Sequence, residues 1–227
     1  LNSNVTLNFT TLEKIYECSF EFKKEDWLLI DFAGKRSKFI KKLIELSDCS
    51  DSGFYLDDHQ KLHKVLKQRE GNHKKTLLLG VSFALLDFAE QFPSSLSHTI
   101  VMETGGMKGR RKEIVRDELH SQLKHNLGVK EIQSEFGMTE LLSQAYAKTD
   151  GIFHCPPWMK VFVRHPNNPM GVQKHGTGCL NIIDLANKNS CAFIATDDLA
   201  KVYDDGSFEV LGRVDTSDIR GCNLMVS

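Results

Sequence analysis

The stretch that decides the fold is Ser134–Tyr146, which reads S-E-F-G-M-T-E-L-L-S-Q-A-Y. Its first half is turn-like around Phe136 and Gly137, and its second half has the apolar spacing of a helix face. Thr139 and Glu140 therefore fall at the predicted start of a helix, where backbone amides and the Thr139 hydroxyl can bind a phosphate. Glu140 can hold a magnesium ion shared with that phosphate, and Phe136 can lie flat against a purine. The alternative is a Thr-Glu helix start with a core phenylalanine, and the pattern alone leaves both open.

Upstream of this stretch, strand-like and helix-like segments alternate along the chain. Strands are expected at Trp27–Phe32, Lys75–Gly80, Thr99–Met102 and Glu131–Gln133, and helices at Lys35–Leu46, Asp57–Gln68, Phe83–Phe92 and Arg111–Asn126. Such alternation predicts an α/β fold with a largely parallel sheet flanked by helices. We expect residues 1–150 to form a nucleotide- and acyl-binding part.

Downstream of Gly151 the pattern changes to short strands joined by turns rich in Asn, Pro and Gly. These strands are expected at Val161–Val163, Gly178–Asp184, Ala192–Thr196 and Ser207–Leu211. The spacing predicts a smaller antiparallel, β-rich subdomain over residues 151–227.

The composition excludes several classes of protein. The 227 residues include 29 basic and 30 acidic side chains, and this balance argues against a general electrostatic grip on nucleic acid. The longest apolar run, Leu77–Leu86, is broken by Gly80 and Ser82 and is too short for a membrane span. The six cysteines form no C-x-x-C pair, and with no signal peptide they indicate reduced thiols in a cytoplasmic protein.

Two further turns carry groups that suit a nucleotide. Gly105-Gly106 follows a predicted strand and allows the backbone to approach a ligand closely, although a tight strand–helix turn explains the pair equally well. Asp197-Asp198 ends another strand, where an acid can accept both hydroxyls of a ribose. Arg213 follows nearby in the sequence and can pair with the same sugar or with phosphate.

The order of these turns resembles the adenylate-forming superfamily of acyl-activating enzymes. In finer detail the chain is similar to the acyl-protein synthetase family, which supplies activated fatty acid to the reductase of bacterial bioluminescence. The segments that carry this resemblance are V-M-E-T-G-G-M-K-G-R-R (Val101–Arg111), Ser134–Tyr146, C-P-P-W-M-K-V (Cys155–Val161) and G-R-V-D-T-S-D-I-R-G-C-N-L (Gly212–Leu224).

The resemblance implies a role for each matching residue in the F-G-M-T-E motif and the Gly-Gly turn. Thr139 would contact the α-phosphate, Glu140 would hold Mg²⁺, and Phe136, followed by Gly137, would flank the adenine. The Gly105-Gly106 turn would border the nucleotide and the acyl pocket.

The later motifs receive roles in the same way. Asp198 stands at the ribose-binding acid of a T-G-D motif, in which Asp197 replaces the glycine. Arg213 would assist at the ribose, Asp215 matches a hinge position, and Cys222 would take the acyl group from the adenylate.

The implied reaction is ATP-dependent activation of a carboxylic acid, expected to be a fatty acid, followed by transfer to a protein thiol as a thioester. An acyl-acceptor reductase is the implied partner. Two alternatives stay open: an acyl-CoA ligase resembling phenylacetate–CoA ligase, and a non-catalytic module that binds nucleotide or acyl groups.

The chain departs from the superfamily in having no Ser/Thr/Gly-rich phosphate loop before Lys35, which predicts an incomplete N-terminal part, and no C-terminal lid domain.

Overall fold

The computed structural model describes residues 29–31, 44, 49–55, 58–107, 110–112 and 114–214. The chain forms two compact units, one within Leu1–Thr104 and Asp117–Gln133 and the other within Gly105–Arg116 and Ser134–Ser227. These units differ from the predicted division into domains 1–150 and 151–227, which stays a prediction. Asp215, Cys222 and the predicted helix Lys35–Leu46, apart from Ile44, lie outside the described residues.

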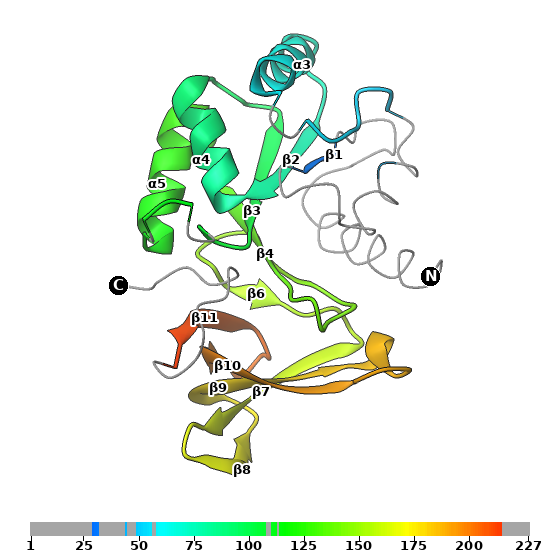
Figure 1. The fold of residues 1–227 in the computed structure, drawn as a ribbon, viewed down its shortest axis with the longest axis vertical. Coiled ribbons are helices and arrows are strands. Elements are labelled where there is room, and N and C mark those ends of the chain that lie inside the picture. Colours follow the sequence, from blue (N-terminus) through cyan, green and yellow to red (C-terminus); the bar gives the residue numbers. More distant parts are fainter. Residues whose placement is uncertain are drawn as a thin grey trace. The chain divides into compact units, whose positions relative to one another are not determined.

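The first unit contains a parallel sheet with helical crossovers (Figure 1). Its strands follow the order β1 (Leu29–Asp31), β2 (Thr76–Val81) and β3 (Thr99–Thr104), and its helices are α3 (His59–Gly71), α4 (Ser82–Gln91) and most of α5 (Arg116–Leu127). Leu77 on β2 faces Leu29 on one side and Ile100 on the other. The predicted alternation of strands and helices is confirmed here.

Local sequence explains where these elements begin and end. The Asp58 side chain accepts a hydrogen bond from the backbone N–H of Lys61 at 3.0 Å and so caps the start of α3. All six residues of β2 are buried, as expected for a strand covered on both faces. Leu85, Leu86 and Phe88 on α4 are buried too, so they belong to the core of this unit.

The second unit contains an antiparallel sheet. Its first strand is β4 (Ile132–Phe136), of which Ser134–Phe136 belong to this unit. The other strands are β5 (Ala145–Ala147), β6 (Phe153–His154), β7 (Met159–His165), β8 (Asn168–Gln173), β9 (Gly176–Asp184), β10 (Phe193–Val202) and β11 (Phe208–Arg213). Their order is β4-β5-β6-β11-β10-β9-β7-β8. The predicted antiparallel, β-rich portion is therefore confirmed.

This sheet curls around a single apolar core. The core draws buried residues from β4 to β7 and from β9 to β11, and it contains three phenylalanine rings. The centroid of Phe136 lies 5.4 Å from that of Phe208 and 5.9 Å from that of Phe153. The edge-to-face contact of Phe136 with Phe208 is the favourable arrangement for aromatic rings. A flat sheet could not bring side chains of β4 and β7 into one cluster, because five strands lie between them.

The helix predicted at the end of Ser134–Tyr146 is wrong. The structure has a turn at Thr139–Glu140, followed by β5, which pairs with β4 through Phe136 and Ala145. Three backbone hydrogen bonds oppose a helix here. The amides of Leu142 and Ser143 donate to the carboxylate of Asp184, and the carbonyl of Glu140 accepts from the side chain of Asn187. Long-range contacts therefore override the local apolar spacing.

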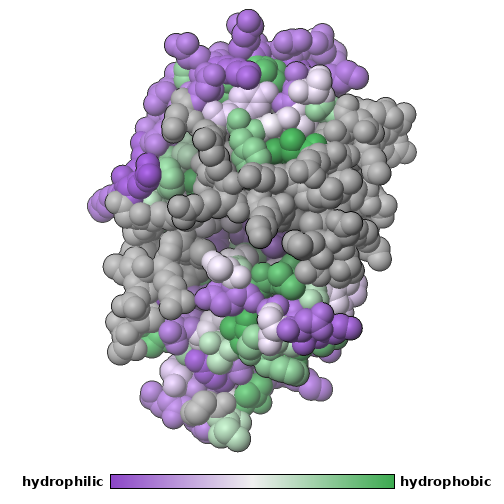
Figure 2. Space-filling model, turned by 45° about the vertical axis from the view of Figure 1, so that its right-hand side comes forward, coloured by the Kyte–Doolittle hydropathy of each residue, from purple (hydrophilic) through white to green (hydrophobic). Residues whose placement is uncertain are grey.

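The surface of the second unit carries exposed apolar side chains. Met170, Val172, Leu185 and Phe193 are exposed, and hydrophobic surface is visible among hydrophilic residues around β7 to β10 (Figure 2). Within the part of the chain that the structure describes, no helix is both long enough and apolar enough to cross a membrane.

Two phenylalanines of the second unit test the position of the core. Phe208→Ala removes a fully buried ring and is expected to lower the free energy of unfolding by about 3–5 kcal/mol. Phe193→Ala is the matched control, because this ring is 72% exposed, and a change within about 0.5 kcal/mol is expected. Urea titration followed by tryptophan fluorescence measures both. Equal losses in the two variants would contradict the assignment of the core.

Candidate functional site

Asp198 and Arg213 meet where β10 and β11 pair. The two residues are direct partners in the register, and Arg213 Nε lies 3.8 Å from Asp198 Oδ1. A second contact joins Arg213 Nη2 to Asp197 Oδ2 at 3.6 Å. Strand alternation separates the two acids: the Asp198 side chain is 11% exposed and that of Asp197 is 58% exposed. The guanidinium of Arg213 therefore contacts both the buried carboxylate of Asp198 and the exposed carboxylate of Asp197.

Arg164 on β7 completes this group, and no motif in the sequence singles it out. Its Nη2 lies 4.0 Å from Asp197 Oδ1, and its Nη1 donates to Asn181 Oδ1 at 2.8 Å. The alternation of V-F-V-R places Arg164 on the same strand face as Phe162, but only the strand order reveals Asp197 as its partner.

The backbone beside Asp198 is irregular. Pairing between β9 and β10 shifts between Ala195 and Leu199, and we refer to this bulge-like irregularity as the bulge. The Thr196 hydroxyl bridges the irregular region, because it donates to the carbonyl of Leu180 at 2.9 Å and accepts from the N–H of Asp198 at 3.2 Å. The bulge and this bridge fix the direction in which the Asp198 side chain points.

Thr139 and Glu140 lie together on the loop between β4 and β5, and both are exposed. This loop is held by groups that follow β9. Asn187 Nδ2 donates to the Glu140 carbonyl at 2.7 Å, and the Leu141 amide closes a turn on the Met138 carbonyl. The loop therefore presents a hydroxyl and a carboxylate to solvent on a fixed backbone.

Asp184 at the end of β9 is the main anchor of this loop. Its Oδ2 accepts from the amides of Leu142 and Ser143, both at 2.9 Å. Its Oδ1 accepts from the Ser143 hydroxyl at 2.7 Å and from the Ala186 amide at 3.1 Å. Trp158 Nε1 donates to the same Ser143 hydroxyl. Asp184 is fully buried, so four hydrogen bonds satisfy a carboxylate that water does not reach.

Phe136 and Gly137 occupy the end of β4 and the first position of the loop. The Phe136 ring is 5% exposed and packs in the core, as the alternative of a core phenylalanine predicts. Its faces and edges are engaged by Phe153 and Phe208, so little of the ring is accessible to a purine.

Gly105 and Gly106 form the turn after β3, with φ angles of +79° and +65°. These values lie in the left-handed region, where a side chain is unfavourable, so the turn requires glycine at both positions. The predicted residues thus fall on three segments of the second unit. Asp198 and Arg213 are in contact, Thr139 and Glu140 share one loop, and Gly105-Gly106 lies on a third segment.

Cys155 follows β6 and lies close to Asp184. Burial raises the pKa of the Cys155 thiol to about 12, and the negative charge of Asp184 adds to this rise. A thiol with such a pKa stays protonated at neutral pH and is a poor nucleophile. Among the described residues, no group of three or more His, Cys, Asp or Glu side chains is arranged to hold a metal ion.

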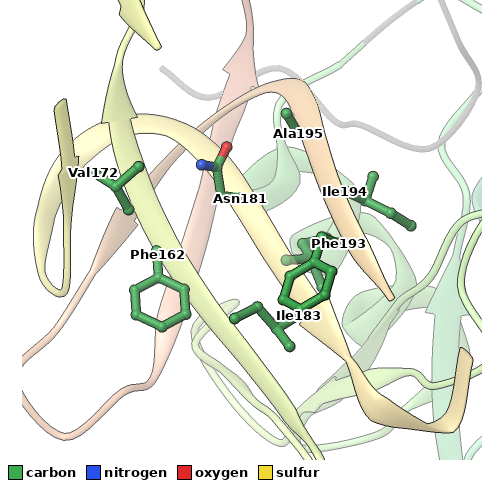
Figure 3. Close-up of a pocket in the computed structure, with 8 residues that line it drawn as sticks. Phe162, Val172, Asn181, Ile183, Phe193, Ile194 and Ala195 are labelled. Atoms are coloured by element: carbon green, nitrogen blue, oxygen red, sulfur yellow. The ribbon is translucent and has the colours of Figure 1, made fainter. Parts of the chain in front are cut away.

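An apolar groove of about 320 Å³ lies on the outer face of β7, β9 and β10 (Figure 3). Phe162, Ile183 and Phe193 supply its apolar walls, and the Asn181 amide is a polar group among them. Because Asn181 also binds Arg164, the groove and the Asp197 network share a residue.

Comparison with solved structures shows which fold this is. MatB from Rhodopseudomonas palustris with ATP bound aligns with a TM-score of 0.62 at 15% identity, over 91% of this chain and 44% of that chain. Coronafacic acid ligase from Pectobacterium brasiliense gives 0.60 at 15% identity, over 92% and 43%. A malonyl-CoA ligase with methylmalonyl-CoA and AMP bound gives 0.62 at 18% identity, over 94% and 49%.

These likenesses show that the chain shares its fold with a part of each of these proteins. The chain spans a little under half the length of each of these structures. No family model and no curated protein matches the sequence.

Asp184→Asn tests the loop anchor. The asparagine amide has only one acceptor oxygen, and its NH₂ group would point at two of the groups that now donate to Asp184. Because these donors would lose their acceptor, we expect the free energy of unfolding to fall by about 2–4 kcal/mol. Hydrogen exchange at the amides of Leu142, Ser143 and Ala186 should accelerate. Asp204→Asn is the control, because Asp204 is exposed in a turn, and no change beyond about 0.5 kcal/mol is expected. Unchanged exchange at the three amides would refute the anchoring role.

Proposed function

We propose that this chain carries the acid-activating part of an AMP-forming ligase. In the first step a carboxylate oxygen of the substrate attacks the α-phosphorus of ATP. The bond between the α- and β-phosphates breaks, pyrophosphate leaves, and an acyl-adenylate forms. In the second step a thiolate attacks the acyl carbon, AMP leaves with the electron pair of the broken anhydride bond, and a thioester forms.

The observation that carries this proposal is the Asp198–Arg213 pair on a fold shared with ligases. The solved neighbours include MatB with ATP bound and a malonyl-CoA ligase with AMP bound, and a third is named as a coronafacic acid ligase. In the proposed site Asp198 accepts the ribose hydroxyls, and Arg213 donates to the sugar or to the α-phosphate. Since the likeness covers less than half of each neighbour, the complete activity belongs to the proposal.

The β4–β5 loop supplies the phosphate side of the proposed site. The Thr139 hydroxyl would donate to the α-phosphate, and the turn's fixed backbone would keep it in place. Because this segment is a turn, the amides of a helix start make no contribution. Phe136 would support the loop from the core and would not stack on the adenine with an open ring face. Gly137 and Gly105-Gly106 would allow close approach of the backbone to the nucleotide.

The Glu140 side chain fits a role in binding Mg²⁺. Magnesium ions at phosphate sites are commonly held by one or two carboxylates together with the substrate's phosphates. An exposed glutamate on an anchored turn matches this donor set, and the described residues offer no all-protein cage. When bound, the ion would neutralise phosphate charge, which favours attack by a carboxylate.

The acceptor thiol has two candidates. Cys222, which lies outside the described residues, would accept the acyl group if the chain acts like an acyl-protein synthetase, with a fatty acid as substrate and a reductase as partner. The malonyl-CoA ligase described above favours coenzyme A as the acceptor instead, because its structure holds methylmalonyl-CoA together with AMP. Cys155 is a weaker candidate, because burial raises the pKa of its thiol to about 12 and so disfavours the thiolate.

Carboxylate-dependent exchange of labelled pyrophosphate into ATP tests the first step on the full-length protein. A panel from malonate to long-chain fatty acids should give exchange with at least one acid. Asp198→Ala is expected to lower kcat/KM for ATP by about 10- to 100-fold, since a charged hydrogen bond contributes about 1.5–3 kcal/mol. Asp204→Ala on the exposed turn should exchange like the wild type. AMP binding without exchange for any acid would favour the non-catalytic module.

Cys222→Ser separates the two acceptors. If Cys222 accepts the acyl group, the wild type should retain radioactive fatty acid after denaturation and release it with hydroxylamine, and the variant should retain none. Pyrophosphate exchange precedes the thiol step and serves as the internal control. Normal formation of an acyl-CoA by both proteins, with no covalent label on either, would instead identify a CoA ligase.

A further inference from the structure

Two carboxylates compete for Arg213. Asp197 and Asp198 are neighbours on β10, and Arg213 contacts both, at 3.6 Å and 3.8 Å. Asp197 is the more exposed acid, so it can turn with little steric restraint, whereas Asp198 is held by the bulge and by Thr196. The carboxylate of Asp197 can therefore compete with Asp198 for Arg213, and the proposed ribose site depends on the Asp198–Arg213 pair.

Arg164 opposes this competition. It contacts Asp197 Oδ1, whereas Arg213 contacts Oδ2, so the two guanidinium groups hold one carboxylate between them. The side chain of Arg164 is largely buried, and its hydrogen bond to Asn181 fixes its direction. Arg164 is thus a fixed cation, and its position comes from β7 and β9 rather than from the strands of the proposed site.

We propose that Arg164 is a positioning residue for the nucleotide: it shares the charge of Asp197 with Arg213 and so keeps Arg213 within reach of Asp198. This inference rests on the proposed function. It also explains how the chain tolerates an acid at the position where the resembled T-G-D motif has glycine. Without Arg164, Arg213 would turn toward the exposed acid, where a bidentate pair can form. The proposed ribose site would then lose its cation.

The test is a double-mutant comparison of Arg164 and Asp197 in the full-length protein. Arg164→Met should raise KM for ATP in pyrophosphate exchange, and Kd for AMP in calorimetry, by about 5- to 10-fold, with a smaller change in kcat. Asp197→Asn removes the competing charge, so Arg164→Met in that background should change KM by less than about 2-fold. Arg164→Lys should restore part of the affinity, because the charge returns without the fork that binds Asn181.

The outcomes distinguish failure of the positioning role of Arg164 from failure of the proposed ligase function. If Arg164→Met weakens nucleotide binding equally in both backgrounds, its role is packing alone and the positioning role is overturned. The same conclusion follows if the wild type is active and Arg164→Met behaves like it. A wild type that neither exchanges pyrophosphate nor binds AMP overturns the proposed function itself, and the positioning role with it.

Discussion

The hydrogen bonds to the buried carboxylate of Asp184 hold the second unit in its curled form. Asp184 ends β9, whereas its donors Leu142 and Ser143 lie between β4 and β5. In the strand order, β6, β11 and β10 separate β5 from β9. These bonds therefore connect strands that are far apart in the sheet, which requires the sheet to curl. A buried carboxylate is costly unless every lone pair is used, so the loop and the curl stabilise one another.

The same curl determines which side chains become available for chemistry. Strand alternation along β10 directs Thr196, Asp198, Ala200 and Val202 inward and leaves Asp197 outside. The bulge interrupts the ladder where the acids occur, and the Thr196 hydroxyl replaces part of the missing pairing. The irregularity makes an inward-facing acid compatible with the sheet.

The sequence predicted the elements whose signals are local and missed those that depend on distant partners. α3 and α4 have apolar spacing and clear ends, and β2 and β3 are short apolar runs, so these were predicted within a few residues. The segment after Phe136 has helical spacing but is a loop, because Asp184 and Asn187 take its backbone groups. Arg164 was missed for the same reason: the pairing of β7 with β9, and of β9 with β10, is invisible in a single sequence.

Phe136 shows that the role of a motif residue depends on where the fold places its side chain. An aromatic ring before a glycine suits a purine only if one face is open, yet this ring is 5% exposed and lies at right angles to Phe208. Moving it toward a nucleotide would open a cavity beside Phe153 and Phe208, at a cost of several kcal/mol. The core therefore holds the ring, and the ring fixes the start of the loop. In the proposed site, recognition of the nucleotide then depends on the loop's polar groups and on the Asp198–Arg213 pair rather than on stacking against Phe136.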